Sequence, residues 1–161
     1  TGAGFPGVPL KIAFPHLEAC LLDSLKKRVN FLEETFQLLK LENITAIHGR
    51  AEEFAKNKAY RETYDLCVSR AVSNLATLSE YCLPYVKTGG FFISYKSGTV
   101  QEEVEQAQKA VKILGGRIQD VVYFQLPDSE IQRSLVVIEK VKATPGRYPR
   151  KAGTPLKEPL S

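Results

Sequence analysis

The chain alternates between strand-like and helix-like hydrophobic patterns, and this alternation limits the folds open to it. Short apolar runs bounded by turn residues predict strands, and apolar residues repeating at steps of three and four predict helices. Because helical segments separate most of the strands, we expect parallel pairing through right-handed crossovers. The sequence therefore predicts an α/β fold around a mostly parallel sheet. The expected strands cover residues 19–22, 44–48, 65–70, 91–96, 118–125 and 135–141, and the helices cover residues 6–14, 25–41, 51–58, 75–86 and 99–114.

The last two expected strands break this alternation. Only residues 126–134 separate them, which is too short a connection for a helical crossover. We therefore expect an antiparallel hairpin inside an otherwise parallel sheet. Two local features are also predicted: Ser24 as the N-cap of the following helix, and a chain reversal at Gly89-Gly90.

A glycine-rich turn occupies residues 1–7. Gly2, Gly4 and Gly7 fit the pattern G-x-G-x-x-G, which lets backbone approach a nucleotide at the carboxyl edge of a parallel sheet. The pattern alone is compatible with a dinucleotide, and Asp23, after the next strand, can accept ribose hydroxyls in either case. Such a turn normally follows a buried strand. None precedes it and the sequence has no Met, so we expect an internal start in a longer protein. Without that strand the sheet should be incomplete, and if the molecule itself lacks the strand, we expect the turn to be mobile.

Charge is distributed unevenly along the 161 residues. The net charge is +4, and residues 142–161 carry five basic residues and one acidic residue, so the whole excess lies there. Proline and glycine recur in the same segment, which favours an extended basic arm that suits a polyanion. A solvated, disordered terminus is an equal alternative. The predicted organisation is one domain over residues 1–141 followed by this C-terminal arm, residues 142–161.

Cysteine and histidine usage narrows the function classes. Cys20, Cys67 and Cys82 are odd in number, lie in apolar stretches and form no C-x-x-C pair, which indicates reduced thiols and a cytoplasmic protein. His16 and His48 lack the spacing of metal ligands, so no metal site is expected. No apolar stretch approaches the roughly 18 residues of a membrane span. We expect a monomer without membrane partners.

Five motifs, in order along the chain, support a more specific interpretation. A parallel sheet that ends in an antiparallel hairpin is similar to the Rossmann-like fold of S-adenosylmethionine-dependent methyltransferases. The motifs occupy residues 1–7, 21–32, 48–53, 68–71 and 148–155. Together, they resemble the bacterial 16S rRNA guanine-N7 methyltransferase G family, apart from the first strand and helical extension that the family has in front.

This resemblance implies S-adenosylmethionine as the cofactor. Structural alternatives exist for several of the implied contacts: ordinary turn positions for Gly2 and Gly4, helix capping for Asp23, the helix dipole for Glu52 and a salt bridge for Arg70. The predicted donor contacts are Gly2, Gly4, Phe5, Asp23, Ser24, Ala51, Glu52 and Arg70.

The resemblance also implies that the substrate is 16S rRNA or a small ribosomal subunit precursor, with a guanine of the 530 loop as target. Guanine N7 carries a lone pair in the unmodified base, so methylating it requires no general base. No catalytic residue is therefore certain, and Arg70 and Lys96 are candidates for positioning.

Two clusters are predicted to contact RNA. Lys26, Lys27 and Arg28 lie in the first turn of a helix, where the macrodipole disfavours cations, and this placement indicates a functional role. In the C-terminal arm, cations flank an aromatic ring that can stack on a base. The residues are Arg147, Tyr148, Arg150 and Lys151. Two alternatives stay open: an NAD(P)-binding Rossmann oxidoreductase and a non-catalytic RNA-binding module.

Overall fold

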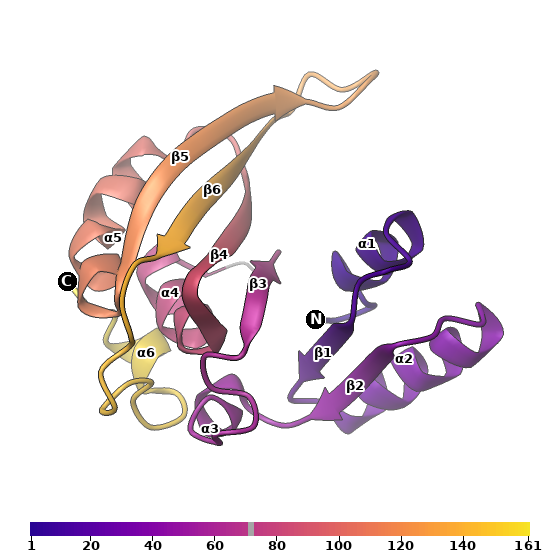
Figure 1. The fold of residues 1–161 in the computed structure, drawn as a ribbon. Helices are drawn as coiled ribbons and strands as arrows, with labels where there is room; N and C mark the ends of the chain where they lie inside the picture. The colour runs from indigo at the N-terminus through magenta and orange to yellow at the C-terminus, as the bar shows by residue number, and fades with distance from the viewer. Residues whose placement is uncertain (71–72) are drawn as a thin grey trace. The chain divides into compact units, whose positions relative to one another are not determined.

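The computed structural model describes residues 1–70 and 73–161 (Figure 1). Ala71, the last residue of the 68–71 motif, therefore lies outside the described residues. The chain divides into two compact units, residues 1–51 (unit 1) and residues 52–161 (unit 2), which are described separately below. Over the described ranges, no helix combines the length and apolar character needed to cross a membrane.

Unit 1 contains a two-stranded parallel sheet and two helices. Ala19 pairs with Ile44 and Asp23 with His48, so both strands end at the same edge. The core of the unit is formed by Val8, Leu21, Leu32, Phe36 and Ile44. The elements are α1 (Gly7–Ala13), β1 (Ala19–Asp23), α2 (Lys26–Leu38) and β2 (Ile44–His48).

The start of α2 differs from the prediction. Leu25, in an extended conformation, occupies the N-cap position and makes no side-chain cap, so the interpretation of Ser24 as the cap is wrong. Instead, Oδ1 of Asp23 accepts the backbone N–H of Leu25 at 3.0 Å. An aspartate that bonds to the backbone two residues ahead makes an Asx-type turn, which satisfies the chain before the helix begins. The capping function therefore belongs partly to Asp23.

Unit 2 contains a four-stranded mixed sheet in the order β3-β4-β6-β5. β3 and β4 are parallel, whereas β6 is antiparallel to both of its neighbours, β4 and β5. The predicted terminal hairpin is thus confirmed, and β6 is the reversed strand of this sheet. The elements are α3 (Ala51–Phe54), which begins at the unit boundary, β3 (Tyr64–Ser69), α4 (Leu75–Cys82), a 3-10 helix η1 (Leu83–Tyr85), β4 (Val86–Ser97), α5 (Gln101–Ile113), β5 (Gly116–Gln125), β6 (Gln132–Lys140) and α6 (Thr154–Lys157).

The described strands form two separate sheets instead of one continuous sheet. This agrees with the expectation of an incomplete sheet. β1 has β2 as its hydrogen-bonded neighbour, and β3 has β4. β1, β2 and β3 therefore each have one edge without a strand partner among the described residues.

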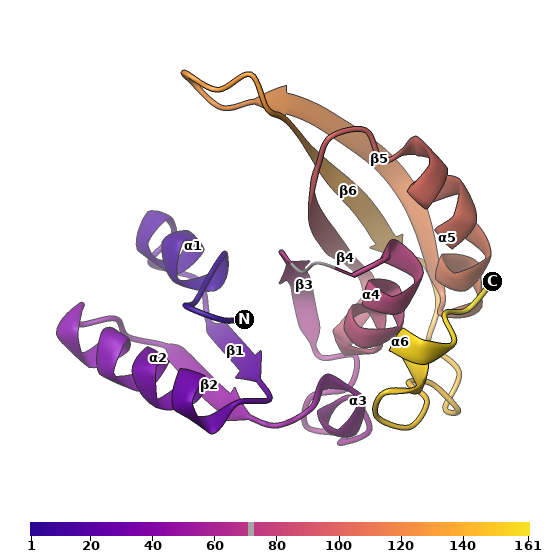
Figure 2. The same cartoon turned by 180° about the vertical axis from the view of Figure 1, so that it is seen from behind.

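The core of unit 2 lies between its sheet and two helices. α4 and α5 pack against one another and against the strands (Figure 2). Phe92 of β4 and Ile138 of β6 are fully buried beneath Leu75 and Val111 of the two helices. Burial of these large apolar side chains, each worth about 1.5–3 kcal/mol, is the main stabilising contribution to this unit.

The glycine pair in β4 does not reverse the chain. β4 begins at Val86 and runs through Gly89 and Gly90, so the predicted turn is wrong. The pairing of β3 and β4 is irregular at this point: Tyr64 faces Val86, whereas Leu66 faces Phe91. A Cβ on Gly90 would lie 2.5 Å from the carbonyl oxygen of Asp65. The glycine therefore permits close approach of two strands around an irregularity.

The C-terminal arm is folded onto unit 2 and is not extended. It contains α6, and Thr144, Tyr148 and Pro155 are buried. Thr77 of α4 donates its hydroxyl to the carbonyl of Pro155 at 2.8 Å. Composition indicated an extended segment because proline and glycine resist regular structure, but side chains elsewhere in unit 2 supply the partners that order it.

Candidate functional site

The glycine turn before α1 uses its glycines in two ways. Gly2 and Gly4 both have positive φ, 59° and 93°. A Cβ on Gly2 would meet nothing within 4 Å, so its backbone faces open space. A Cβ on Gly4 would lie 2.6 Å from Val8 Cγ2 and 2.9 Å from Leu32 Cδ2. Gly2 is thus available to a ligand, whereas the absence of a side chain at Gly4 serves packing inside unit 1.

Asp23 is the electrostatic centre of this end of unit 1. It is 5% exposed and lies at the end of β1. Oδ2 accepts the backbone N–H of Gly2 at 2.8 Å, while Oδ1 accepts the backbone N–H of Leu25 at 3.0 Å. Desolvation opposes ionisation, but these hydrogen bonds outweigh it and lower the pKa of Asp23 to about 2. An ionised acceptor therefore joins the glycine turn to the start of α2.

A hollow of about 370 Å³ lies beside this carboxylate. It is lined by Gly2, Ala3, Lys27, Arg28 and Phe31, so two of the predicted RNA-contact cations face the glycine turn. Nη1 of Arg28 lies 3.6 Å from Oδ2 of Asp23, while the Arg28 side chain stays 53% exposed. The geometry thus places a carboxylate, cations and open backbone at the carboxyl end of β1, the edge at which open α/β sheets bind ligands.

Phe31 was not predicted. Its signal was present in the sequence, because α2 buries Val29, Leu32 and Phe36 and Phe31 falls outside that spacing. Phe5 and Ser24, two predicted donor contacts, are also exposed, and the Ser24 carbonyl lies 3.2 Å from Nε2 of His48.

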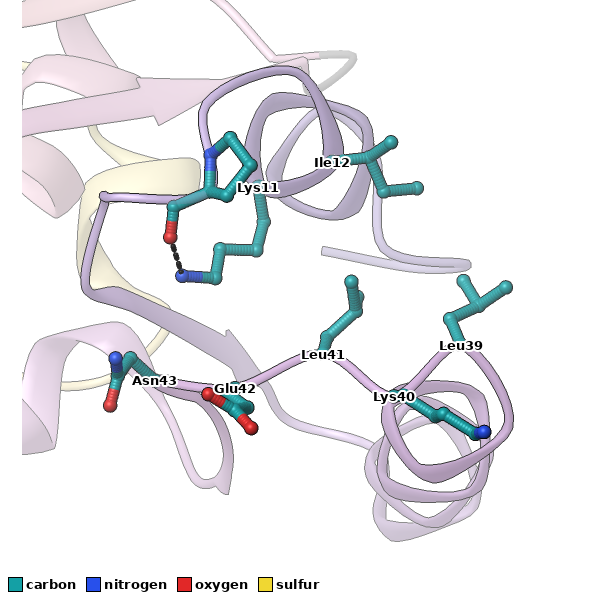
Figure 3. A pocket seen from close by; sticks show the side chains of 8 residues that line it. Lys11, Ile12, Leu39, Lys40, Leu41, Glu42 and Asn43 are labelled. Carbon is teal, nitrogen blue, oxygen red and sulfur yellow. Dashed lines mark hydrogen bonds between the residues drawn. The ribbon is translucent and has the colours of Figure 1, made fainter.

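A second hollow, of about 390 Å³, lies at the opposite end of the unit 1 strands (Figure 3). Its lining includes Lys11 and Asn43, and the Asn43 carbonyl accepts Ala19 at the start of β1. The buried Lys11 ammonium donates to the carbonyls of Pro15, at 2.7 Å, and Leu17. Its charge is thus satisfied by the chain itself, and the hollow is at the edge where ligands of such sheets do not bind.

In unit 2, Glu52 is committed to the C-terminal arm. Its buried carboxylate accepts the backbone N–H of Gly153 at 2.9 Å. Ala51, which was predicted together with Glu52 to contact the methyl donor, is half-buried at the start of α3. Arg70 is exposed directly after β3. The structure therefore gives Glu52 an anchoring contact that the sequence did not reveal.

Lys96 is held by two acceptors. Its Nζ donates to the carbonyl of Ser73 at 2.6 Å and to Oε1 of Glu103 at 2.6 Å. The same Glu103 oxygen accepts the backbone N–H of Leu75 at 2.7 Å. Lys96 therefore ties β4 to the start of α4 and to α5.

Arg150 makes an ion pair inside unit 2. Its Nη2 and Nε donate to Oε2 of Glu80 at 2.7 and 3.1 Å, and Nε and the backbone N–H donate to Oε1 at 3.0 and 2.8 Å. Glu80 is 0% exposed, and the Arg150 side chain is 24% exposed. The hydrogen bonds to this carboxylate raise the pKa of Arg150 above its ordinary value. The Arg150 charge is thus paired inside unit 2, and its contact with RNA phosphates stays a prediction.

Tyr148 packs inside unit 2. It is 6% exposed and belongs to the core of this unit, and its stacking on an RNA base stays a prediction. Arg61 donates to the carbonyls of Tyr148 at 2.9 Å and Thr144 at 2.7 Å and so anchors the arm. Arg147 stays exposed, with its guanidinium carbon 5.0 Å from the Tyr148 ring centroid, and Lys151 is also exposed.

Glu62 and Lys140 provide another anchor that sequence reasoning missed. Glu62 accepts the Thr144 N–H at 2.7 Å and lies 3.0 Å from Nζ of fully buried Lys140. Burial lowers the pKa of Lys140, against the effect of Glu62. Desolvation likewise opposes the charge on Glu62, but hydrogen bonds from Thr144 and Lys140 lower its pKa overall. The arm is thus attached through paired charges.

Comparison with known proteins decides the family. A model of the family rRNA small subunit methyltransferase G matches residues 1–136. The chain belongs to this family. A Lachnoclostridium phytofermentans protein named ribosomal RNA small subunit methyltransferase G is 58% identical over 160 residues, and one from Clostridium novyi is 53% identical. In both comparisons the match covers 99% of this chain and 66% of the relative, so the chain spans about two thirds of their length.

Solved structures show the same fold at low identity. The TYW2 protein of M. jannaschii, in complex with AdoMet, matches with a TM-score of 0.65 and 14% identity over 87% of this chain and 66% of that one. Geranyl diphosphate methyltransferase in complex with SAM matches at 0.62 and 11% identity, over 87% and 75%. These likenesses confirm the predicted Rossmann-like methyltransferase fold.

Proposed function

We propose that the protein transfers a methyl group from S-adenosylmethionine to N7 of a guanine in the 530 loop of 16S rRNA. Membership of the methyltransferase G family over residues 1–136 carries this proposal. An rRNA substrate and three unpaired thiols both fit the cytoplasm.

The residues of unit 1 fit such a donor. Asp23 is ionised at neutral pH, lies at a strand end and is suited to accept ribose hydroxyls, and Gly2 leaves backbone open beside it. S-adenosylmethionine supplies an electrophilic methyl group when bound. We assign Gly2, Gly4, Phe5, Asp23, Ser24 and Ala51 of unit 1, and Glu52 and Arg70 of unit 2, to the donor site.

The proposed reaction needs no proton transfer before methylation, because the N7 lone pair is free in guanine. Positioning and electrostatics then carry the rate enhancement. Arg70, exposed after β3, is assigned to positioning. Lys96 contributes indirectly, by fixing the start of α4 through Ser73 and Glu103.

RNA phosphates would be bound by cations that the fold leaves exposed. Lys26, Lys27 and Arg28 of α2 are exposed, and so are Arg147 and Lys151 of the arm. Phosphate contacts of this kind supply affinity and register without reading sequence. The proposed substrate form is 16S rRNA or a small-subunit precursor, bound by a monomer.

Donor binding tests the cofactor assignment. Isothermal titration with S-adenosylhomocysteine should give a binding isotherm that Asp23→Asn weakens, whereas NADH should give none. Binding of NADH alone would instead indicate an oxidoreductase. RNA binding without affinity for S-adenosylhomocysteine would indicate a non-catalytic RNA-binding module.

Mapping the product tests reaction and substrate together. 16S rRNA from cells lacking the modification, incubated with the full-length protein and S-adenosylmethionine, should gain one methyl group on a single guanine of the 530 loop. Mass spectrometry of nuclease fragments locates that group, and its position on N7 is checked by selective strand cleavage. A methyl group on another atom or in another loop contradicts the proposal.

A further inference from the structure

Phe31 is exposed on a helix whose other aromatic side chain is buried. It is 51% exposed, whereas Phe36, one and a half turns later on α2, is 7% exposed. The core of unit 1 therefore does not use the Phe31 ring.

Phe31 lines the hollow beside the glycine turn together with two cationic residues, Lys27 and Arg28. Lys27 and Arg28 lie four and three residues before Phe31, a spacing that puts side chains on the same face of a helix. All three residues line the 370 Å³ hollow, together with Gly2 and Ala3. The hollow thus combines a flat apolar surface, two cations and accessible backbone.

This combination matches the chemistry of a nucleotide in an unpaired strand. Single-stranded nucleic acid is bound by aromatic rings that stack on its bases and by cations that follow its phosphates. Arg28 is partly neutralised by Asp23 at 3.6 Å, so Lys27 carries the stronger attraction for phosphate. A protein partner would need a larger apolar surface than one ring provides.

We propose that Phe31 stacks on an unpaired base of the RNA substrate while Lys27 and Arg28 bind the adjoining phosphates. The identity of that RNA rests on the proposed function, but the stacking contact does not require that methyl transfer occurs. Phe31 is thereby a substrate-binding residue of the hollow.

Stacking and phosphate contacts respond differently to salt, and this difference provides the first test. The probe is a fluorescein-labelled RNA hairpin that carries the 530 loop, titrated by anisotropy at several salt concentrations. Phe31→Leu should weaken binding about 5- to 150-fold with an unchanged salt slope, because no phosphate contact is lost. Lys27→Gln should weaken binding and lower the magnitude of the salt slope by about one.

A tryptophan at the same position gives a direct signal. The chain contains no Trp, so Phe31→Trp introduces the sole indole, and its fluorescence should fall when a base stacks on it. The matched control is Phe14→Trp, at an exposed phenyl ring after α1, which should keep its fluorescence on adding RNA. Both variants should melt at the wild-type temperature.

Several results would overturn the assignment. Wild-type RNA affinity in Phe31→Leu, unquenched fluorescence in Phe31→Trp, or equal quenching in the Phe14→Trp control would each do so. A loss of S-adenosylhomocysteine affinity in Phe31→Leu with RNA affinity unchanged would place the ring in the donor site instead. If wild-type protein binds the hairpin and RNA quenches Phe31→Trp as expected, but wild-type protein methylates no guanine, the proposed function fails and the stacking contact stands.

Discussion

The ion pair between Arg150 and Glu80 predicts a large effect of one substitution on stability. Arg150→Met keeps most of the alkyl volume but removes the guanidinium. The fully buried carboxylate of Glu80 then keeps only the backbone N–H of residue 150 among the hydrogen bonds that it accepts from this residue. Breaking a buried pair from one side costs about 3–5 kcal/mol, whereas an exposed pair is worth about 0–1 kcal/mol. The remaining N–H and the partial exposure of the arginine favour the lower end. We expect a loss of about 3 kcal/mol.

Urea unfolding at pH 7, followed by circular dichroism, measures this loss. For a chain of this size it corresponds to a fall of about 6–12 °C in Tm. The matched control is Arg147→Met, which removes an exposed guanidinium and its contact with the Tyr148 ring at a cost of about 0.5–1 kcal/mol. The double variant Glu80→Leu with Arg150→Met should recover much of the loss, since an apolar pair replaces the buried charge.

A different outcome would refute the reasoning. If Arg150→Met unfolds within 1 kcal/mol of the wild type, Glu80 does not depend on Arg150 for its burial. If the same variant also binds the RNA hairpin more weakly, the guanidinium contacts RNA, as the sequence first indicated.

Further measurements follow from the site and from the arm. Gly4→Ala should lower the free energy of unfolding by about 2–4 kcal/mol, because residue 4 has positive φ and its Cβ would clash with Val8. Gly2→Ala should lower it by about 1 kcal/mol, because its Cβ would meet open space. Urea unfolding of the two variants measures the difference. The folded pKa of Asp23 is about 2, below its unfolded value, so its contribution of about 2 kcal/mol is present above pH 4 and is lost as pH falls towards 2. Asp23→Asn should therefore remove that part of the pH dependence of the urea midpoint between pH 5 and 2. A chain ending at Ala143 should lose cooperative unfolding of unit 2, seen as a lower m-value, since anchors at Glu52 and Glu80 lose their partners.

The sequence predicted the elements of the fold because hydrophobic spacing reports which face of a segment is buried. The short loop over residues 126–134 also determined the hairpin, since no parallel crossover fits in it. Spacing did not reveal strand irregularity, so the pair Gly89-Gly90 was interpreted as a turn although both residues lie inside β4. Nor did it distinguish Ser24 from Asp23 as the residue that satisfies the start of α2.

The candidate site was predicted in part for a similar reason. Asp23 and Gly2 were found because strand ends and glycine turns have a local signature. The pairing of Arg150 with Glu80 joins residues 70 positions apart, and no local pattern encodes it. Glu80 did carry one hint, as a lone acid among the buried residues of α4. A charge in an otherwise apolar helix requires a partner somewhere in the fold.

The long separation of that pair also affects how the protein is made. Helix α4 emerges from the ribosome with a carboxylate destined for full burial, but its guanidinium partner is synthesised 70 residues later. At about 5–20 residues per second, the interval is roughly 4 to 14 s. During that time α4 cannot bury the face that holds Glu80 without a large desolvation cost. Unit 2 is therefore expected to complete its folding late in synthesis, and chaperones that bind incomplete chains have several seconds in which to recognise it.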